Sequence, residues 1–274
     1  MNLLPTISII TVVRNGERSI EHAIKSIISQ TYKNIEYIII DGKSTDGTVE
    51  KIQKYHENIN YWISEPDSGI YDAMNKGVLA SNGDWLLFIN ADDHLVSATS
   101  IEEAVSYLTT CEKSIAYGKI NFTYPNGSVA SYGSEWNDLK YRFRNVAACI
   151  PHQATFHAKA LFAGQYFDTS FRIAGDYDFL LRHLKDHDAC FIPVTVTNMD
   201  GGGISATVSK IDLLKDTRKA QIKNNMYRFS PSISWYISAI KLLVVDSIIR
   251  TIGIRGKDKI RDFFRFSKPR TLSI

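Results

Sequence analysis

Short strand-like and helix-like segments alternate through the N-terminal part of the chain. The stretches "ISIITVV" at 7–13 and "IEYIII" at 35–40 are rich in β-branched and apolar residues, which is typical of strands buried on both faces, as in a parallel sheet. Between them, within residues 14–30, an apolar stripe is formed at helical spacing by Ile20, Ala23, Ile24, Ile27 and Ile28. Further short strands are expected at 61–64 and 85–89. This alternation predicts an α/β fold with a mostly parallel sheet, flanking helices and right-handed crossovers.

The regular strand–helix alternation ends after Leu95, and longer, more varied helices and strands are expected from there on. The pattern predicts a helix at 100–109, a hairpin around the "PNG" turn within 115–133, a helix at 179–187 and a strand at 189–199. From Val208 onward the pattern favours helix. We therefore expect one α/β domain at 1–205 and a helical, basic amphipathic extension at 206–274.

The overall charge is small but unevenly distributed. The 274 residues are 44% hydrophobic and 22% charged, which is ordinary for a globular protein with a real core. A formal net charge of +3 is too small to indicate a nucleic-acid partner, and none is expected. Residues 241–270 hold nine Lys or Arg and three Asp, a net charge of +6, so the remainder of the chain carries −3.

The basic C-terminal stretch also has apolar residues near helical spacing: Ile233, Ile237, Ile240, Val244 and Ile248. A basic, aromatic amphipathic helix of this kind docks on an anionic membrane surface. The alternative is a helix packed on the protein core or on another subunit. The sequence leaves both interpretations open.

Cysteine usage and the N-terminus predict a cytoplasmic location. The three cysteines are odd in number and show no CxxC spacing, which favours a reducing compartment. The first residues lack the basic and apolar regions of a signal peptide. No uncharged apolar run reaches the ~18 residues needed to span a bilayer. If the C-terminal helix docks on lipid, the protein sits at the inner face of the cytoplasmic membrane.

Three polar clusters follow predicted strands: "RNGE" at 14–17, "DGKSTDGT" at 41–48 and "NADD" at 90–93. Each cluster alone is well explained as a turn. In an open parallel sheet, however, ligands bind outside the carboxyl ends of the strands, where all three clusters meet. Together they predict a binding site at this edge of the sheet.

The adjacent carboxylates of Asp92 and Asp93 point to the chemistry of that site. Two neighbouring carboxylates that both stay ionised favour a cation beside them, and hard oxygen ligands suit Mg²⁺ or Mn²⁺. Such a metal often takes its remaining ligands from substrate phosphates. The chain has neither a GxxxxGK[ST] nor a GxGxxG motif, which argues against a P-loop enzyme and a dinucleotide-binding domain.

Two long segments, "SIITVVRNGERSIEHAIKSIISQTYKNIEYIIIDGKSTDGT" and "EPDSGIYDAMNKGVLASNGDWLLFINADD", resemble the family 2 glycosyltransferases with a GT-A fold. The similarity is closest to bacterial enzymes of surface-polysaccharide assembly of the colanic acid type. It is close over 5–95 and looser to about 205. The resemblance implies an inverting hexosyltransferase that uses a nucleoside diphosphate sugar, with a UDP-sugar favoured, and Mn²⁺ or Mg²⁺. It also implies a saccharide or lipid-linked saccharide as acceptor.

The resemblance assigns roles residue by residue. Asp41 matches the acid that closes the second strand beside the nucleobase, while Gly42 stands where many members have a second acid. Asp92 and Asp93 match the metal-binding motif, with Asn90 in place of its commoner first Asp. The residues expected to contact the nucleotide are Thr11, Val13, Asn15, Glu17, Asp41, Asn75, Lys76 and Asp92.

The segment "IAGDYDFLLR" matches the part of the family that carries the catalytic base. An inverting transfer needs a carboxylate that takes the proton of the acceptor hydroxyl. Asp176, expected just ahead of a helix, matches this base, and Asp178 is the reserve candidate and an expected acceptor contact. Asp176 as a helix N-cap is the structural alternative. His152 and Gln153 are expected in the acceptor or sugar pocket, whereas His157 is expected to pack in the core.

Two other functions compete with glycosyl transfer. A sugar-nucleotide nucleotidyltransferase also binds a nucleotide and a metal on an α/β sheet, but it ordinarily has a Gly-rich basic loop after the first strand. "RNGERS" provides no such loop. The other alternative is a non-catalytic sugar- or membrane-binding scaffold, which gives no reason for Asp92, Asp93 and Asp176 to occur together.

Overall fold

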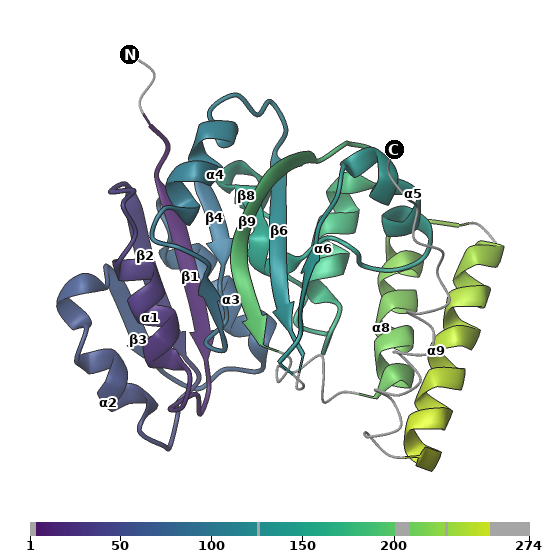
Figure 1. Ribbon diagram of the computed structural model, residues 1–274, viewed down its shortest axis with the longest axis horizontal. Coiled ribbons are helices and arrows are strands. Elements are labelled where there is room, and N and C mark those ends of the chain that lie inside the picture. Colours follow the sequence, from purple (N-terminus) through teal and green to yellow (C-terminus); the bar gives the residue numbers. More distant parts are fainter. Residues whose placement is uncertain (1–3, 125–126, 201–208, 228–229, 253–274) are drawn as a thin grey trace.

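A single sheet runs through the molecule and carries helices on both faces (Figure 1). The computed structural model describes residues 4–124, 127–200, 209–227 and 230–252. The strands follow one another across the sheet in the order β3 (Tyr61–Ser64), β2 (Ile35–Asp41), β1 (Ile7–Val13), β4 (Trp85–Phe88), β8 (Thr155–Ala158), β6 (Ile115–Thr123), β9 (Cys190–Asp200) and β5 (Asp93–Leu95), with β7 (Val129–Tyr132) paired to β6.

The first four strands form the parallel sheet that the sequence predicts. β1 pairs in parallel with β2 and β4, and β2 pairs in parallel with β3. All seven residues of β1 are buried, as are the last five of β2. Strands rich in β-branched and apolar residues fit here because both faces of the sheet are covered.

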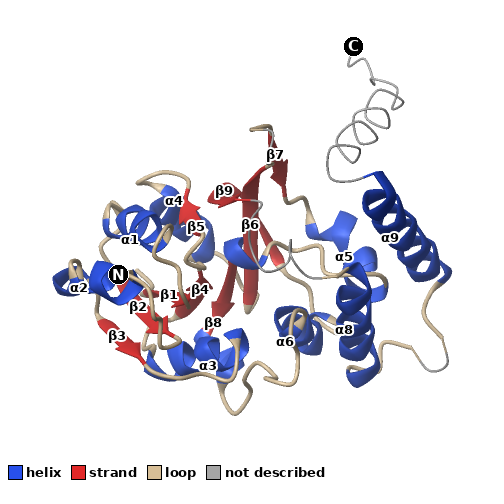
Figure 2. Cartoon of the chain, turned by 90° about the horizontal axis from the view of Figure 1, so that it is seen from below, coloured by secondary structure: helices blue, strands red, loops and turns tan. Residues whose placement is uncertain are grey.

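Two layers of helices cover the sheet, one on each face (Figure 2). Residues of α1 (Ile20–Ile28), α2 (Thr48–Gln53) and α4 (Ser100–Leu108) pack into one apolar core. Residues of α3 (Ile70–Ala80), α5 (Trp136–Asn145) and α6 (Gly175–Leu184) pack into the other. The predicted apolar stripe of the first helix is confirmed, because Ile20, Ala23, Ile24 and Ile27 of α1 are buried.

Beyond β4 the sheet becomes mixed. β8 pairs antiparallel with both β4 and β6, while β6 and β9 pair in parallel. The predicted hairpin is confirmed by the antiparallel pairing of β6 with β7. Two successive antiparallel pairings restore the original strand direction, so β6 and β9 run the same way as β1 and β4. Their carboxyl ends therefore lie at the same edge of the sheet.

Within the described residues, two helices follow the sheet, as the sequence predicts. α8 (Lys210–Lys223) packs against α6, and α9 (Ile233–Ile252) packs against α8. No helix in the described part of the chain is both long enough and apolar enough to cross a lipid bilayer. Residues 253–274, part of the expected basic extension, lie outside the described residues. The proposed division at 205/206 stays a prediction.

Candidate functional site

A cavity of about 480 Å³ opens at the carboxyl edge of the parallel strands. Its walls come from the loop after β1, the loop after β4, the start of α3, the segment before β8 and the start of α6. Among the side chains that line it are Val13, Arg14, Asn15, Tyr71, Asn90, Asp92, Asp93, His152, Gln153, Arg172, Ile173 and Asp176. Two of the three polar clusters singled out in the sequence contribute to this cavity.

Asn15 joins the loop after β1 to the loop after β2. Its backbone adopts a left-handed conformation with φ of 53°, which Asn tolerates better than most residues. Its N–H donates to Ser44 Oγ at 2.7 Å, and its Oδ1 accepts from the N–H of Thr45 at 2.9 Å. Val13 lines the cavity beside it. The convergence of these two loops is what the strand-end clusters predict.

Three other residues assigned to the nucleotide lie outside the cavity lining. Thr11 is fully buried and accepts a hydrogen bond from the Tyr37 hydroxyl at 3.3 Å. The backbone of Glu17 contacts Asp46 and Lys51. Asp41 is fully buried at the end of β2 and accepts hydrogen bonds from Ser44 and from Ser64 Oγ, the latter at 2.6 Å. A direct ligand contact by the Thr11 side chain is not supported, because the sheet encloses it.

Gly42 leaves room for a carboxylate from elsewhere in the chain. A Cβ atom on Gly42 would lie 2.2 Å from Oδ2 of Asp67, so a side chain at position 42 would displace Asp67. Asp67 also accepts a hydrogen bond from the N–H of Gly69 at 2.9 Å. Asp67 thus occupies the space beside Gly42, a position that sequence reasoning did not identify.

Asn75 and Lys76 bind other parts of the protein through hydrogen bonds and an ion pair, and neither of them lines the cavity. The side-chain amide of Asn75 bonds both the N–H and the carbonyl of Phe167, each at 2.9 Å. Lys76 pairs with Glu65 at 2.7 Å and donates to the carbonyl of Pro66 at 2.7 Å. The expectation that Asn75 faces a nucleotide is not supported, because both of its polar atoms are used by the backbone of Phe167.

The "NADD" cluster presents oxygen atoms to the cavity. Asn90, Asp92 and Asp93 all line it, and Asp93 is almost fully buried at the first position of β5. Oδ1 of Asn90 is buried without a hydrogen-bond partner among the described residues. No three His, Cys, Asp or Glu side chains of that part of the chain gather closely enough to hold a metal by themselves. This donor set fits a hard divalent cation that takes further ligands from water or phosphate.

Asp176 lies in the first turn of α6 and faces the cavity. The helix begins at Gly175, earlier than predicted, and Ala174 occupies the N-cap position, so the N-cap interpretation of Asp176 is wrong. An acidic residue in a first turn is favoured by the helix dipole. Burial raises the pKa of the Asp176 carboxyl, and this outweighs hydrogen bonds from the Tyr177 N–H and the Tyr71 hydroxyl. A raised pKa suits a group that accepts a proton near neutral pH.

Tyr71 of α3 is the partner of Asp176. Its hydroxyl lies 3.2 Å from Oδ1 of Asp176 and donates to the carbonyl of Ile173 at 2.5 Å. A Cβ atom on Gly175 would lie 2.7 Å from the Tyr71 ring. Glycine at position 175 therefore lets the Tyr71 ring pack directly against the start of α6.

His152 and Gln153 line the cavity from the short turn before β8. Both are buried, and the His152 ring stacks on Phe88 with centroids 5.3 Å apart. Neither ring nitrogen of His152 has a hydrogen-bond partner within the described residues. Burial lowers the pKa of His152 to about 4, so the imidazole is neutral at neutral pH. His157 is fully buried among aromatic rings, as expected.

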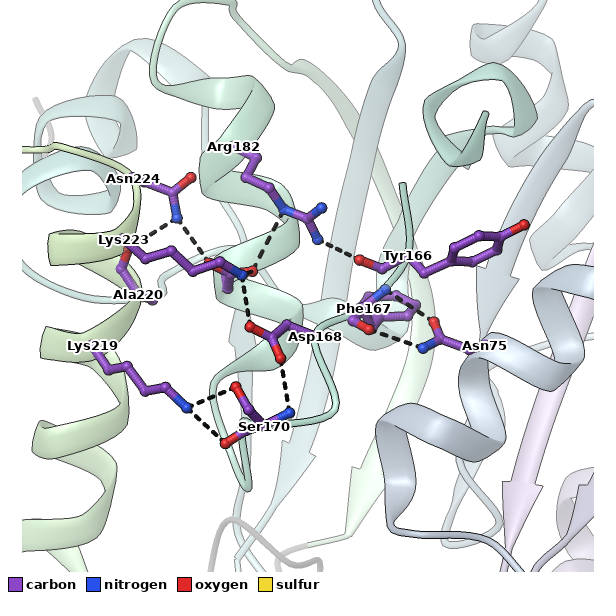
Figure 3. A network of polar contacts seen from close by, with 11 residues as sticks. Asn75, Tyr166, Phe167, Asp168, Ser170, Arg182, Lys219, Ala220, Lys223 and Asn224 are labelled. Carbon is purple, nitrogen blue, oxygen red and sulfur yellow. Dashed lines mark hydrogen bonds and ion pairs between the residues drawn. The ribbon is translucent and has the colours of Figure 1, made fainter. Parts of the chain in front are cut away.

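Asp178 points away from the cavity. Its side chain is fully buried and contacts Lys223 Nζ at 2.9 Å, Asn224 Nδ2 at 2.9 Å and Arg182 Nε at 3.5 Å. Figure 3 shows Lys223 and Asn224 reaching from α8 toward this point, with Arg182 on the neighbouring helix. The expectation that Asp178 contacts an acceptor is therefore not supported, because protein groups engage both of its oxygens.

Arg14, Tyr71 and Arg172 line the cavity although sequence reasoning did not single them out. Arg14 belongs to the "RNGE" cluster, so its position after the first strand was an available signal. Tyr71 lies within the segment "EPDSGIYDAMNKGVLASNGDWLLFINADD", and Arg172 directly precedes the segment "IAGDYDFLLR". Only their packing across the cavity distinguishes them from other residues of those segments.

Comparisons with known proteins agree on one family. The model of glycosyl transferase family 2 matches residues 8–169. An uncharacterized glycosyltransferase of Mycobacterium tuberculosis strain H37Rv is 30% identical over 84% of this chain and 88% of its own length. A PGL/p-HBAD biosynthesis glycosyltransferase of Mycobacterium bovis BCG is 30% identical over 77% of this chain and 83% of its own length.

Two solved structures share the fold at low sequence identity. Staphylococcus aureus TarS 1–349 in complex with UDP-GlcNAc has a TM-score of 0.62 at 17% identity, covering 80% of this chain and 66% of that chain. The mannosyltransferase PcManGT of Pyrobaculum calidifontis, in complex with GDP-Man and Mn²⁺, has a TM-score of 0.62 at 14% identity. That alignment covers 98% of this chain and 77% of PcManGT.

Proposed function

This chain belongs to glycosyl transferase family 2 and is a glycosyltransferase, and on that premise we propose that it transfers a sugar from a nucleoside diphosphate sugar to an acceptor hydroxyl with inversion. The observation that carries the proposal is that Asp176, with a raised pKa, lines the same cavity as Asn90, Asp92 and Asp93. One cavity thus combines a proton acceptor with oxygen ligands for a cation.

Asp176 is the catalytic base of this proposal. Its carboxylate takes the proton of the acceptor hydroxyl while the hydroxyl oxygen forms a bond to the anomeric carbon. The bond between the anomeric carbon and the diphosphate oxygen breaks, and the nucleoside diphosphate leaves. Tyr71 orients the carboxylate through the contact to Oδ1. His152 and Gln153 supply hydrogen bonds to sugar hydroxyls, which the unpartnered ring nitrogens of His152 support.

Asp92 and Asp93, with Asn90 Oδ1, are the residues that would hold Mn²⁺ or Mg²⁺. A divalent cation bound there supplies positive charge beside the diphosphate leaving group. The buried, unpartnered Oδ1 of Asn90 supports this assignment, as does the oxygen-only donor set. Mn²⁺ in the PcManGT complex is consistent with it.

A UDP-sugar is the proposed donor. Val13 and Asn15 line the cavity where the nucleotide is proposed to bind, while the buried Asp41 supports the loop after β2 through its hydrogen bonds to Ser44. The UDP-GlcNAc complex of TarS supports a uridine nucleotide, while GDP-Man in PcManGT makes GDP-sugars the necessary comparison. Neither a nucleotidyltransferase nor a non-catalytic scaffold is favoured by any feature of the cavity.

The proposed setting is bacterial surface-polysaccharide synthesis at the inner face of the cytoplasmic membrane, on a saccharide or lipid-linked acceptor. Exposed apolar side chains on α9 support docking on lipid: Ile233, Tyr236, Ile237, Ile240, Leu243 and Val244. They recur at spacings of three and four residues, which places them on one side of the helix. The net charge of +6 over residues 241–270 complements an anionic surface.

Thermal shift with a panel of UDP- and GDP-sugars, with and without Mn²⁺, tests the donor assignment. We expect one sugar nucleotide to raise the melting temperature in a Mn²⁺-dependent manner. Incubation of that donor with an acceptor extract should then release the nucleoside diphosphate and give a product of inverted anomeric configuration. If no nucleoside diphosphate sugar binds, the proposed function is wrong.

A further inference from the structure

The segment that carries Asp176 into the cavity is held from two sides. Residues 167–173 lead into α6, and Arg172 and Ile173 line the cavity together with Asp176. On one side lies α3, where Asn75 bonds both backbone groups of Phe167 and Tyr71 bonds the carbonyl of Ile173. On the other side lies α8, which starts about forty residues beyond the end of the family match at residue 169.

The contacts from α8 reach the backbone of this segment directly. Oδ2 of Asp216 accepts hydrogen bonds from the N–H groups of Arg172 at 3.0 Å and Ile173 at 2.9 Å. Lys219 donates to the carbonyl of Ser170 at 2.7 Å and to its hydroxyl at 2.9 Å (Figure 3). The 167–173 segment is not part of a helix or strand, so its N–H groups depend on such partners.

Lys223 links the same segment to the body of α6. Its ammonium pairs with Asp168 at 2.8 Å (Figure 3) and also with the buried Asp178 at 2.9 Å. Burial opposes ionisation of Asp168, but the hydrogen bond from Lys223 holds the pKa of Asp168 below its usual value. A fully buried carboxylate such as Asp178 costs free energy unless a cation pairs with it. Lys223 therefore fixes α8 against both the segment and the helix that carries Asp176.

Ile173 connects these contacts to the proposed chemistry. Its N–H is held by Asp216 of α8, and its carbonyl is held by the Tyr71 hydroxyl, which also contacts Asp176. A shift of Ile173 changes the position of Tyr71 relative to the Asp176 carboxylate. Because misplacement of a reacting group by about 1 Å can cost about 10²-fold in rate, small movements here matter.

We propose that α8 is part of the catalytic unit and that Asp216 and Lys223 are positioning residues, which set the geometry of Asp176 through the 167–173 segment. This inference rests on the proposed role of Asp176 as the base. It also moves the functional boundary of the chain, since the helix expected to open a separate extension supports the active site.

Asp216→Ala tests the inference, with Asp216→Asn as the conservative variant and Lys215→Ala as the matched control. Lys215 is the preceding residue on α8 and is exposed. We expect Asp216→Ala to lower kcat about 10- to 100-fold while the KM for the donor and the Kd for UDP with Mn²⁺ stay unchanged. Asp216→Asn should recover part of kcat, because its side-chain oxygen can still accept from the two N–H groups.

Hydrogen exchange provides a readout that does not depend on activity. Asp216→Ala should speed amide exchange in a peptide that covers 167–176, while Lys215→Ala should leave it unchanged. Lys223→Met and Lys223→Arg form a second pair, in which only Met is expected to lower kcat. If Asp216→Ala does not fold, the kcat values of Lys223→Met and Lys223→Arg test whether α8 positions Asp176.

Two results would overturn the inference. One is a kcat for Asp216→Ala and Lys223→Met equal to that of Lys215→Ala. The other is a lower activity of the variant samples that is explained entirely by a smaller folded fraction. In that case the rate per folded molecule equals that of the unmodified protein. Failure of the proposed function is recognised separately, because Asp176→Asn would then keep its turnover whatever the α8 variants do.

Discussion

The Tyr71 hydroxyl lies 3.2 Å from Oδ1 of Asp176, although 105 residues separate the two in sequence. The contact joins α3, which packs beside the first strands of the sheet, to α6, which follows β8 in the chain. It places a hydrogen-bond donor on a carboxylate whose pKa is already raised by burial. Burial therefore raises the pKa of the proposed base, and the Tyr71 hydrogen bond partly opposes this shift.

Tyr71→Phe should move the acid limb of the kcat profile to higher pH. The Tyr71 hydrogen bond favours the ionised carboxylate of Asp176, so its loss raises the pKa of Asp176 further. The base acts when deprotonated, and its activity therefore rises as pH increases through that pKa. His152, which also lines the cavity, is neutral above its pKa of about 4, so it does not produce this limb. If the acid limb of the Tyr71→Phe profile stays at the same pH, the Tyr71 hydroxyl does not influence the ionisation of Asp176.

Asp176→Asn should abolish most turnover without weakening donor binding. Asparagine nearly preserves the shape of the side chain but cannot accept the acceptor's proton, so we expect a loss of about 10²–10⁴-fold in kcat. Calorimetry with UDP and Mn²⁺ measures binding in parallel. Asp178→Asn should instead lower thermal stability more than Asp176→Asn does, because it removes a buried partner of Lys223. If Asp176→Asn loses donor binding, Asp176 has a structural role.

Asp92→Asn and Asp93→Asn should remove Mn²⁺-dependent nucleotide binding. Each substitution keeps the size of the side chain and removes a charge that a hard cation favours. Calorimetric titration with UDP and with GDP, in Mn²⁺ or in EDTA, measures the effect. The matched control is Asp138→Asn, an exposed acid at the start of α5, which should bind as the unmodified protein does. Unchanged affinity in both variants would refute the metal assignment.

Ile237→Ser combined with Ile240→Ser should release the protein from anionic vesicles. These side chains are 48% and 61% exposed on α9, where insertion into lipid would bury them. Basic residues near the surface add roughly 1 kcal/mol each, so high salt should release the unmodified protein only in part. Cosedimentation with anionic and neutral vesicles measures both effects.

Leu79→Ser is the control for this experiment, because Leu79 on α3 is 68% exposed and lies outside α9. It should leave vesicle binding unchanged. If the apolar side of α9 instead packs on another protein subunit, the unmodified protein will not bind vesicles. The double variant will then differ from it in oligomeric state. That result would contradict membrane docking.

The sequence by itself determined the strands of the parallel half and the edge at which polar residues gather. β1 and β2 follow from runs rich in β-branched and apolar residues, because a strand buried on both faces needs such side chains. The cluster ending in Asp92 and Asp93 follows directly from a buried strand, which fixes its place at the sheet edge. These are local properties, readable within about ten residues.

Only the tertiary structure decided which polar residues share the cavity. Asp176 and Asp178 are two positions apart, and two positions on a helix differ by about 200° in direction, so one faces the cavity and the other faces α8. The partners of both come from distant parts of the chain: Tyr71 from α3 and Lys223 from α8. Residue spacing along the sequence does not predict such contacts, because they form only when separate helices pack on the same sheet.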